Sequence, residues 1–346
     1  MGSWKKGVLA IGCILFFPTL LMAANTKTAS VKPVLKVYTY KSFVSKWGPG
    51  QKIKEAFERK FPVVLEWVPA SDSVAMWGRI RMEGKMFSGD LIMGLDSHLM
   101  HEVLQSGLLE PANAADYGLK DLPPGVGFES GSGLVPYQYG YYALIYDERK
   151  MKPFASWDEF VQKAPEKSLI IQDPRTSTVG LGFLSWTKTV YGTKWDHFMS
   201  RLRPKLLTVT KGWSDAYGLF LKGEASAVMS YRLSEAYHLV EEKTSHYKGM
   251  IFKKGHPVQT EGIGIARTSQ QKELSRKFIE FLLEPHQQQI LATKSWMYPV
   301  RPAQVRLPEV FESLSKPRFL ESYQFSEIGK QRKSWVDQWT KSMIAL

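Results

Sequence analysis

Aromatic and hydroxyl side chains cluster twice within the stretch KGWSDAYGLFLKGEASAVMSYRLSEAY, which covers residues 211–237. The first cluster comprises Trp213, Ser214 and Tyr217, and the second comprises Ser230, Tyr231, Ser234 and Tyr237. These residue types suit ligand binding, because aromatic rings offer flat π faces and hydroxyl groups donate hydrogen bonds. The alternative interpretation is that the rings belong to the core and that their polar tips find partners locally.

The surrounding residues predict a helix and a strand that would position both clusters. Residues 217–221 are typical of the end of a helix that stops at Lys222 and Gly223, and the apolar residues 225–229 predict a buried strand. Both clusters would then lie at the ends of elements, where loops often carry ligands. The two junctions could therefore face one shared cleft.

A polar loop at residues 172–178 and an acidic residue upstream add hydrogen-bonding groups. Ser177 and Thr178 precede a predicted helix, so their hydroxyls and free backbone N–H groups could face an anion or a polar ring edge. An ordinary helix cap is the other interpretation. Asp72 also has two interpretations: it could cap a helix, or it could place a carboxylate beside a cationic ligand.

The common catalytic and nucleotide-binding motifs are absent from the sequence. It contains no G-x-S-x-G, no P-loop, no G-x-G-x-x-G and no H-E-x-x-H. His98 and His101 could share a helix face and hold a metal with Glu102, although the same spacing also describes an ordinary packed helix face. Without a nucleophile–base constellation, we expect neither catalysis nor a cofactor.

The chain has 346 residues, enough for two domains, and a formal net charge of +13. A basic balance is compatible with nucleic acid, with an anionic membrane surface or with simple solubility. The Lys and Arg residues are spread along the chain, and neither a zinc-finger spacing nor an RRM signature occurs. We therefore expect no nucleic-acid partner.

The N-terminus has the pattern of a secretory signal peptide at residues 1–24. Two lysines precede an apolar run at residues 7–22, and small residues then favour cleavage near Ala24. A permanent signal anchor and lipid attachment at Cys13 are the alternatives, although Pro18 and the short run argue against an anchor. Cys13 is the only cysteine, so the exported chain would contain no disulfide.

Strand and helix patterns alternate after the signal peptide. The predicted strands are residues 33–40, 62–68 and 90–95, with helices beginning after the string WGPG and after Asp72. This order predicts an α/β fold with a mainly parallel sheet, whose ligands bind beyond the carboxyl ends of the strands. We expect residues 38–40, 71–73 and 95–96 to converge on one rim.

A long aromatic strand at residues 135–147 and a second one at 262–266 are interpreted as crossings between two lobes. Further predicted elements are strands at 169–171 and 250–252, helices at 179–191 and 270–283, and a final helix from Ser326. Lobe one would comprise residues 33–138 plus 258–346, with C-terminal helices that could cross between lobes, and lobe two residues 139–257. Such a plan places a cleft between lobes that can close on a ligand.

Eight strings from Pro33 to the C-terminus resemble the bacterial periplasmic thiamine-binding proteins of ABC transporters, within the extracellular solute-binding proteins. The strings are VYTYKSF, WGPG, RMEGK, GLDS, VPYQYGYYALIYD, QDPRTSTVGLG, VTKGWSDAYGLFLKGE and SWMYPV. The resemblance implies an α/β, two-lobed periplasmic binding protein type II fold, each lobe a mainly parallel sheet flanked by helices. It also implies a monomer in the periplasm that captures thiamine or thiamine phosphates and delivers them to a membrane permease, without a metal.

The resemblance further implies a set of ligand-binding residues: Asp72, Ser73, Ser177, Thr178, Trp213, Tyr231, Ser234, Tyr237, Trp296 and Trp47. Thiamine suits this set because its thiazolium is a permanent flat cation, which aromatic faces attract. Asp72 would then neutralise the positive charge.

Two departures from the family pattern concern the ligand. Arg232 and Leu233 stand where small hydroxyl residues are expected, and Ser73 stands where glycine is usual. If Arg232 enters the cleft, it would repel a bare cation and favour a phosphorylated or acidic ligand; if it faces solvent, thiamine fits. The alternatives are a receptor of the same fold for another cationic heterocycle or for ferric iron, to which Tyr237 and His238 could contribute, and a secreted enzyme.

Overall fold

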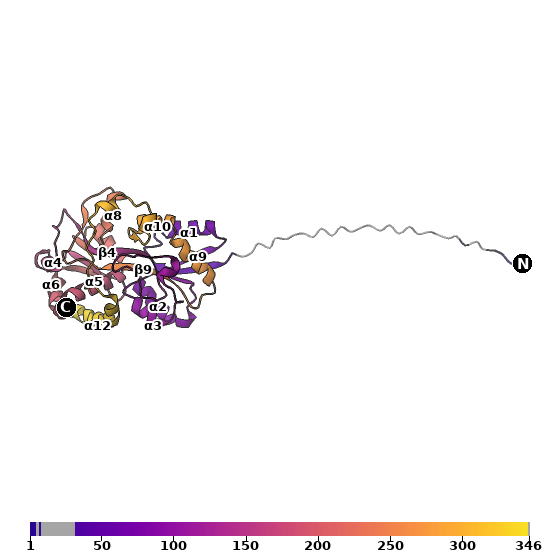
Figure 1. Ribbon diagram of the computed structural model, residues 1–346, viewed down its shortest axis with the longest axis horizontal. Helices are drawn as coiled ribbons and strands as arrows, with labels where there is room; N and C mark the ends of the chain where they lie inside the picture. Colours follow the sequence, from indigo (N-terminus) through magenta and orange to yellow (C-terminus); the bar gives the residue numbers. More distant parts are fainter. Residues whose placement is uncertain (5–6, 8–31, 345–346) are drawn as a thin grey trace. The chain divides into compact units, whose positions relative to one another are not determined.

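The structure is a computed structural model that describes residues 1–4, 7 and 32–344 (Figure 1). The predicted cleavage site at Ala24 and Cys13 lie outside the described residues, as does most of the predicted signal peptide. Residues from Pro33 onward form one compact unit, which is described here by itself. No helix in the described part of the chain has the length and apolar character needed to cross a membrane.

Ten strands of the described residues form one mixed sheet with the order β2-β1-β3-β9-β4-β7-β5-β6, while β8 and β10 pair with β4. The strands are β1 (Val34–Tyr40), β2 (Val64–Ala70), β3 (Leu91–Asp96), β4 (Val135–Asp147), β5 (Leu169–Gln172), β6 (Leu206–Thr210), β7 (Ala227–Tyr231), β8 (Tyr247–Gly249), β9 (Val258–Ile265) and β10 (Tyr298–Pro299). Pairing is parallel at both ends of this order and antiparallel around β4 and β9. The α/β class is therefore confirmed, but the sheet is mixed rather than mainly parallel, because β4 and β9 run against their neighbours.

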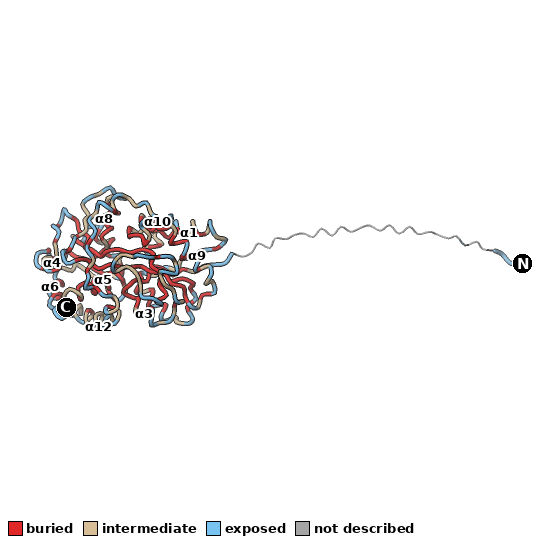
Figure 2. Tube along the Cα trace, viewed as in Figure 1, coloured by how far each residue is buried: buried red, intermediate tan, exposed pale blue. Residues whose placement is uncertain are grey.

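The helices cover both faces of this sheet (Figures 1 and 2). They are α1 (Gly50–Lys60), α2 (Ser73–Glu83), α3 (Met100–Ser106), α4 (Trp157–Lys163), α5 (Thr178–Tyr191), α6 (Trp195–Leu202), α7 (Trp213–Leu221), α8 (Ser234–Val240), α9 (Lys272–Leu282), α10 (Pro285–Ser295), α11 (Val310–Ser313) and α12 (Phe325–Ile344). Buried residues run through the middle of the unit in Figure 2, where the sheet lies.

Strand β4 is hydrogen-bonded to both groups of strands. All of its residues are buried, as expected for a strand covered on both faces. Its residues 135–141 pair with β9, whereas residues 142–147 pair with β7 and β8. This is the strand that we interpreted as a crossing, and the proposed lobe boundaries at 138/139 and 257/258 stay a prediction.

The C-terminal helix α12 packs against α3 and also against α5 and α6. Arg332 forms an ion pair with Glu102 of α3, and Gln338 Nε2 donates to Asp196 Oδ2 of α6 at 2.6 Å. Helix α12 thus contacts helices from both predicted lobes.

One predicted strand is wrong. Residues 250–252 are not a strand, because β8 ends at Gly249. Met250 N still donates to Leu144 O at 2.8 Å, but Phe252 N donates to the side chain of buried His256 instead of to a neighbouring strand. The chain therefore leaves the sheet after Met250.

Candidate functional site

A cavity of about 290 Å³ opens where several strand ends and helix starts meet. This volume lies near the lower end of pockets that hold small organic ligands, roughly 300–1,000 Å³. The lining residues are Tyr40, Ser42, Phe43, Trp47, Pro49, Ser71, Asp72, Ser73, Gln138, Thr178, Val179, Trp213, Ser214, Tyr217, Gly218, Leu221, Tyr231, Ser234, Tyr237, Glu261, Lys294, Ser295, Trp296 and Met297. The cavity is thus mainly aromatic, with a few polar and charged groups.

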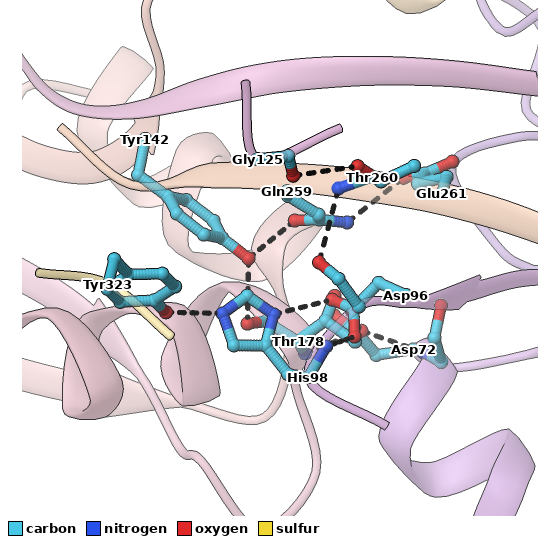
Figure 3. Close-up of polar contacts among 12 residues, drawn as sticks. Asp72, Asp96, His98, Gly125, Tyr142, Thr178, Gln259, Thr260, Glu261 and Tyr323 are labelled. Atoms are coloured by element: carbon cyan, nitrogen blue, oxygen red, sulfur yellow. Dashed lines mark hydrogen bonds and ion pairs between the residues drawn. The ribbon is translucent and has the colours of Figure 1, made fainter. Parts of the chain in front are cut away.

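The carboxylate of Asp72 receives backbone N–H groups from the first residues of three helices. Asp72 caps its own helix α2, with Oδ1 accepting from Ser73 N at 2.7 Å. The same oxygen accepts from Thr178 N of α5 at 3.2 Å (Figure 3), and Oδ2 accepts from Trp213 N of α7 at 3.4 Å. Helix N-termini favour negative charge, so this arrangement both joins the helices and partly neutralises the carboxylate.

Glu261 is a second buried acid on the cavity wall. Its Oε2 accepts hydrogen bonds from Tyr40 Oη at 2.8 Å, from Tyr137 Oη at 2.5 Å and from Gln138 Nε2 at 2.8 Å. Burial raises the pKa of Glu261 to about 7, although these hydrogen bonds oppose the shift. Burial likewise raises the pKa of Asp72 to about 6, against the backbone hydrogen bonds that favour its anion.

The raised pKa of Glu261 predicts a pH-dependent contribution to stability that Glu261→Gln should remove, while the contribution of Asp72 stays in both proteins. Because burial raises the folded-state pKa of Glu261 from 4.5 to about 7, the folded state binds more protons than the unfolded state between these pH values. The stability contributed by Glu261 is therefore present below pH 4.5 and lost as the pH rises through 7. We expect the unfolding free energy of wild type minus that of Glu261→Gln to fall by roughly 3 kcal/mol from pH 4.5 to pH 8.

Urea unfolding of both proteins across this range measures the difference directly. The difference is needed because buried His256, whose pKa is lowered by burial to about 4, affects wild type and variant alike and in the opposite direction. Parallel pH profiles of the two proteins would contradict the assignment of a raised pKa to Glu261.

Trp213 is the centre of the aromatic wall. Its ring stacks on Tyr217 with centroids 4.8 Å apart and an interplanar angle of 24°, and Trp47 approaches it edge-on at 5.8 Å. Trp213 Nε1 donates to Ser230 Oγ at 2.8 Å, and Ser230 Oγ lies 2.9 Å from Ser234 Oγ. The hydroxyls of the second cluster therefore fix the orientation of the indole in the first.

Tyr217 in turn is held in place by buried His238. Its hydroxyl lies 2.8 Å from Nε2 of buried His238, whose Nδ1 lies 2.7 Å from Glu242 Oε2. The imidazole stacks on the Tyr217 ring at 5.8 Å. His238 therefore supports the aromatic wall and does not line the cavity.

Trp296 and Tyr237 bring a further aromatic pair to the cavity, with ring centroids 6.4 Å apart. Trp296 follows helix α10 in the left-handed backbone region, with φ 52° and ψ 50°. Residues other than glycine seldom adopt this conformation, and such strain is often found at functional sites.

The structure brings most of the predicted site residues to this cavity. Those on its wall are Asp72, Ser73, Thr178, Trp213, Tyr231, Ser234, Tyr237, Trp296 and Trp47. Ser177 is fully buried behind the wall as the N-cap residue of α5. Of the expected rim, Tyr40 and residues 71–73 line the cavity, while residues 38–39 and 95–96 do not.

Arg232 and Leu233, which stand where the family pattern has small hydroxyl residues, do not line the cavity. Arg232 is buried and forms an ion pair with Glu235 at 2.5 Å, and its Nε donates to Ser315 O at 3.0 Å. It therefore neither enters the cavity nor faces solvent. Leu233 packs in the hydrophobic core, because the chain turns from β7 into α8 at this point.

Sequence reasoning missed Glu261 and Gln138. Both lie on strands whose residues are all buried, and Glu261 interrupts the otherwise uncharged strand β9. An acidic residue inside a buried strand is rare unless it has partners. The position of Glu261 within an apolar strand was therefore the feature of the sequence that could have identified it.

The predicted metal-binding alternative at residues 98–102 receives no support from the contacts. His98 Nδ1 lies 3.3 Å from Asp96 Oδ2, and its Nε2 lies 2.5 Å from Tyr323 Oη (Figure 3). Glu102 forms ion pairs with Arg81 and Arg332. In the described part of the chain, no group of three or more His, Cys, Asp or Glu side chains is arranged to hold a metal ion.

Comparison with known proteins places this chain among bacterial solute receptors. Residues 52–314 match the family described as bacterial extracellular solute-binding protein. The thiamine-binding periplasmic protein of Salmonella typhimurium is 42% identical over 329 residues, covering 95% of this chain and 98% of that protein.

The solved structure of a periplasmic thiamin binding protein superposes with a TM-score of 0.84 at 42% identity, covering 91% of this chain and 97% of that one. A ferric binding protein from Campylobacter jejuni shares the fold alone, with a TM-score of 0.74 at 17% identity, covering 89% and 99% of the two chains. The periplasmic binding protein fold is thus confirmed, and the chain belongs to the bacterial extracellular solute-binding protein family.

Proposed function

We propose that this protein binds thiamine in the periplasm and delivers it to the permease of an ABC importer. The observation that carries the proposal is the cavity itself, which combines the Trp213–Tyr217 stack with two buried carboxylates. Similarity to thiamine-binding periplasmic proteins along almost the whole chain supports the same ligand. As a member of a solute-binding family, the protein is a receptor and not an enzyme.

The charges around the cavity favour a cation. Among the described residues that line it, Lys294 is the one Lys or Arg, and it forms an ion pair with Glu241 at 3.0 Å. Asp72 and Glu261 are buried and have no cationic partner in the contacts described above. A thiazolium cation placed over the rings would gain roughly 0.5–2 kcal/mol from each good cation–π contact and would compensate these acids.

The finer parts of the proposal follow the same reasoning. The residues on the cavity wall that we predicted from sequence are the proposed binding site, with Asp72 adding negative potential. Thiamine phosphates remain candidate ligands, although the backbone N–H of Thr178, at the start of α5, already donates a hydrogen bond to Asp72 rather than to a ligand. Export through cleavage near Ala24, a monomeric state and a membrane permease partner complete the proposal.

Thiamine should quench the tryptophan fluorescence of the purified protein with submicromolar affinity, because Trp213, Trp296 and Trp47 line the cavity. Competition with thiamine phosphates then ranks the ligands, and native mass spectrometry identifies any molecule that co-purifies. A protein that shows no response at high micromolar thiamine, or that co-purifies with a different heterocycle, would contradict thiamine as the ligand.

A further inference from the structure

The two oxygens of the Glu261 carboxylate have different surroundings. Oε2 already accepts three hydrogen bonds, from Tyr40, Tyr137 and Gln138. Among the described residues, Oε1 accepts one long hydrogen bond, from Gln259 Nε2 at 3.3 Å. The unused acceptor capacity of this cavity-lining acid is therefore on Oε1.

The neighbouring side chains fix this arrangement. Gln259 Oε1 accepts from Tyr142 Oη at 2.6 Å and from Tyr231 Oη at 2.5 Å, so its Nε2 is the group turned toward Glu261 (Figure 3). Gln138, which also lines the cavity, leaves its carbonyl Oε1 without a partner among the described residues. Because this amide oxygen is itself buried, the acceptor with unused capacity in this polar part of the wall is Glu261 Oε1, which suits a ligand that donates an N–H group.

Asp72 differs from Glu261 in this respect. Both of its oxygens receive backbone N–H groups, and these come from helix starts that also offset its charge. Among the described residues, the hydrogen-bond donors to Glu261 are side chains and not helix starts. Of the two acids, Glu261 is therefore the one equipped to contact a ligand donor directly.

We infer that Glu261 recognises the exocyclic amino group of an aminopyrimidine ring, through Oε1. This inference rests on the proposed function and adds to it a residue that selects the pyrimidine end of thiamine. The positively charged ring would occupy the aromatic part of the cavity, whereas the amino group would donate to Glu261. The site therefore discriminates by hydrogen-bond polarity: it accepts an amino group and rejects a carbonyl at the same ring position.

Oxythiamine is the matching probe, because it carries a carbonyl oxygen where thiamine carries the amino group. We expect the wild-type protein to bind thiamine about 10- to 100-fold more tightly than oxythiamine, as expected for a hydrogen bond to a charged acceptor. In Glu261→Gln the amide oxygen can keep the Tyr40 and Tyr137 bonds, which places an N–H donor at the Oε1 position. This variant should bind thiamine more weakly and lose or reverse the preference.

The ratio of the two dissociation constants, measured by fluorescence or calorimetry, is the readout. Asp72→Asn is the matched control: it alters the other buried acid, and we expect it to change both affinities by a similar factor. A wild type that binds thiamine while Glu261→Gln retains the wild-type ratio would overturn the inference. A wild type that binds neither compound would instead overturn the proposed function.

A second measurement requires no variant. The titratable groups that interact with Glu261 are Tyr40, Tyr137, Tyr142, Tyr231 and, through its charge, Asp96. Since burial raises the pKa of Glu261 to about 7, acidification converts Oε1 from an acceptor into a donor. The wild-type preference for thiamine over oxythiamine should therefore shrink from pH 8 to pH 5, and a constant ratio would overturn the inference even if Glu261→Gln failed to fold.

Discussion

Replacing Trp213 with alanine is expected to weaken thiamine binding by about 30- to 100-fold. The indole lines the cavity, stacks on Tyr217 and meets Trp47 edge-on, so it holds a flat aromatic face in place for a cation. A desolvated cation over such a face gains about 2 kcal/mol or more, and the buried apolar area adds to this. Each 1.4 kcal/mol corresponds to a tenfold change in affinity.

The variant Trp213→Phe tests the contribution of the aromatic face separately from that of the hydrogen bond to Ser230. Phenylalanine keeps a ring against Tyr217 but cannot donate to Ser230 as Trp213 Nε1 does. We expect an intermediate loss of affinity from this variant. Because Trp213 is only partly buried, neither substitution should change the thermal unfolding temperature by much. Thiamine affinity within threefold of wild type in Trp213→Ala would show that the ligand lies elsewhere.

The elements around the site were predictable where the local pattern was strong. Residues 135–147 form strand β4 as expected, because alternation and a high aromatic content over this length are typical of a strand. Helix α5 begins at Thr178, next to the predicted start, and Ser177 is its N-cap residue, although the Ser177 side chain makes no capping hydrogen bond. The predicted rim at residues 71–73 likewise follows from the rule that loops after parallel strands carry ligands.

Contacts between distant residues could not be predicted in the same way. Tyr137 and Glu261 are separated by 124 positions, and their hydrogen bond depends on the antiparallel pairing of β4 with β9. A sequence read as mainly parallel strands gives no such register. Asp72 shows the same limit: its cap of α2 was foreseeable, whereas its bonds to α5 and α7 depend on tertiary packing.

The position of the Arg232 side chain was not predicted, because it depends on an ion pair with Glu235. The sequence offered the cavity and the solvent as alternatives for this side chain. The turn into α8 instead places Glu235 three residues later beside the guanidinium, and both side chains are nearly buried, with 6% and 11% exposed. Glu235 Oε2 also accepts a hydrogen bond from Gly249 N at 2.8 Å, so the Arg232–Glu235 pair links α8 to strand β8.

Replacing Arg232 with methionine is therefore expected to lower the free energy of unfolding by about 3–5 kcal/mol. The loss would arise because Glu235 is left buried without a cation, and because the bond to Ser315 O disappears. The double variant Arg232→Met/Glu235→Leu should recover much of this stability, since removing both charges avoids the unpaired carboxylate. Urea unfolding of both single variants and the double variant measures the coupling between the two residues.

Ligand preference provides the decisive comparison for Arg232. Because its guanidinium bonds to Glu235 and Ser315 outside the cavity, Arg232→Met should not alter the ratio of affinities for thiamine and thiamine monophosphate. A selective loss of the phosphorylated ligand would mean that Arg232 reaches the ligand in the bound state. An unchanged ratio together with a large loss of stability would show that this arginine maintains the fold around β7 and α8 and does not choose the ligand.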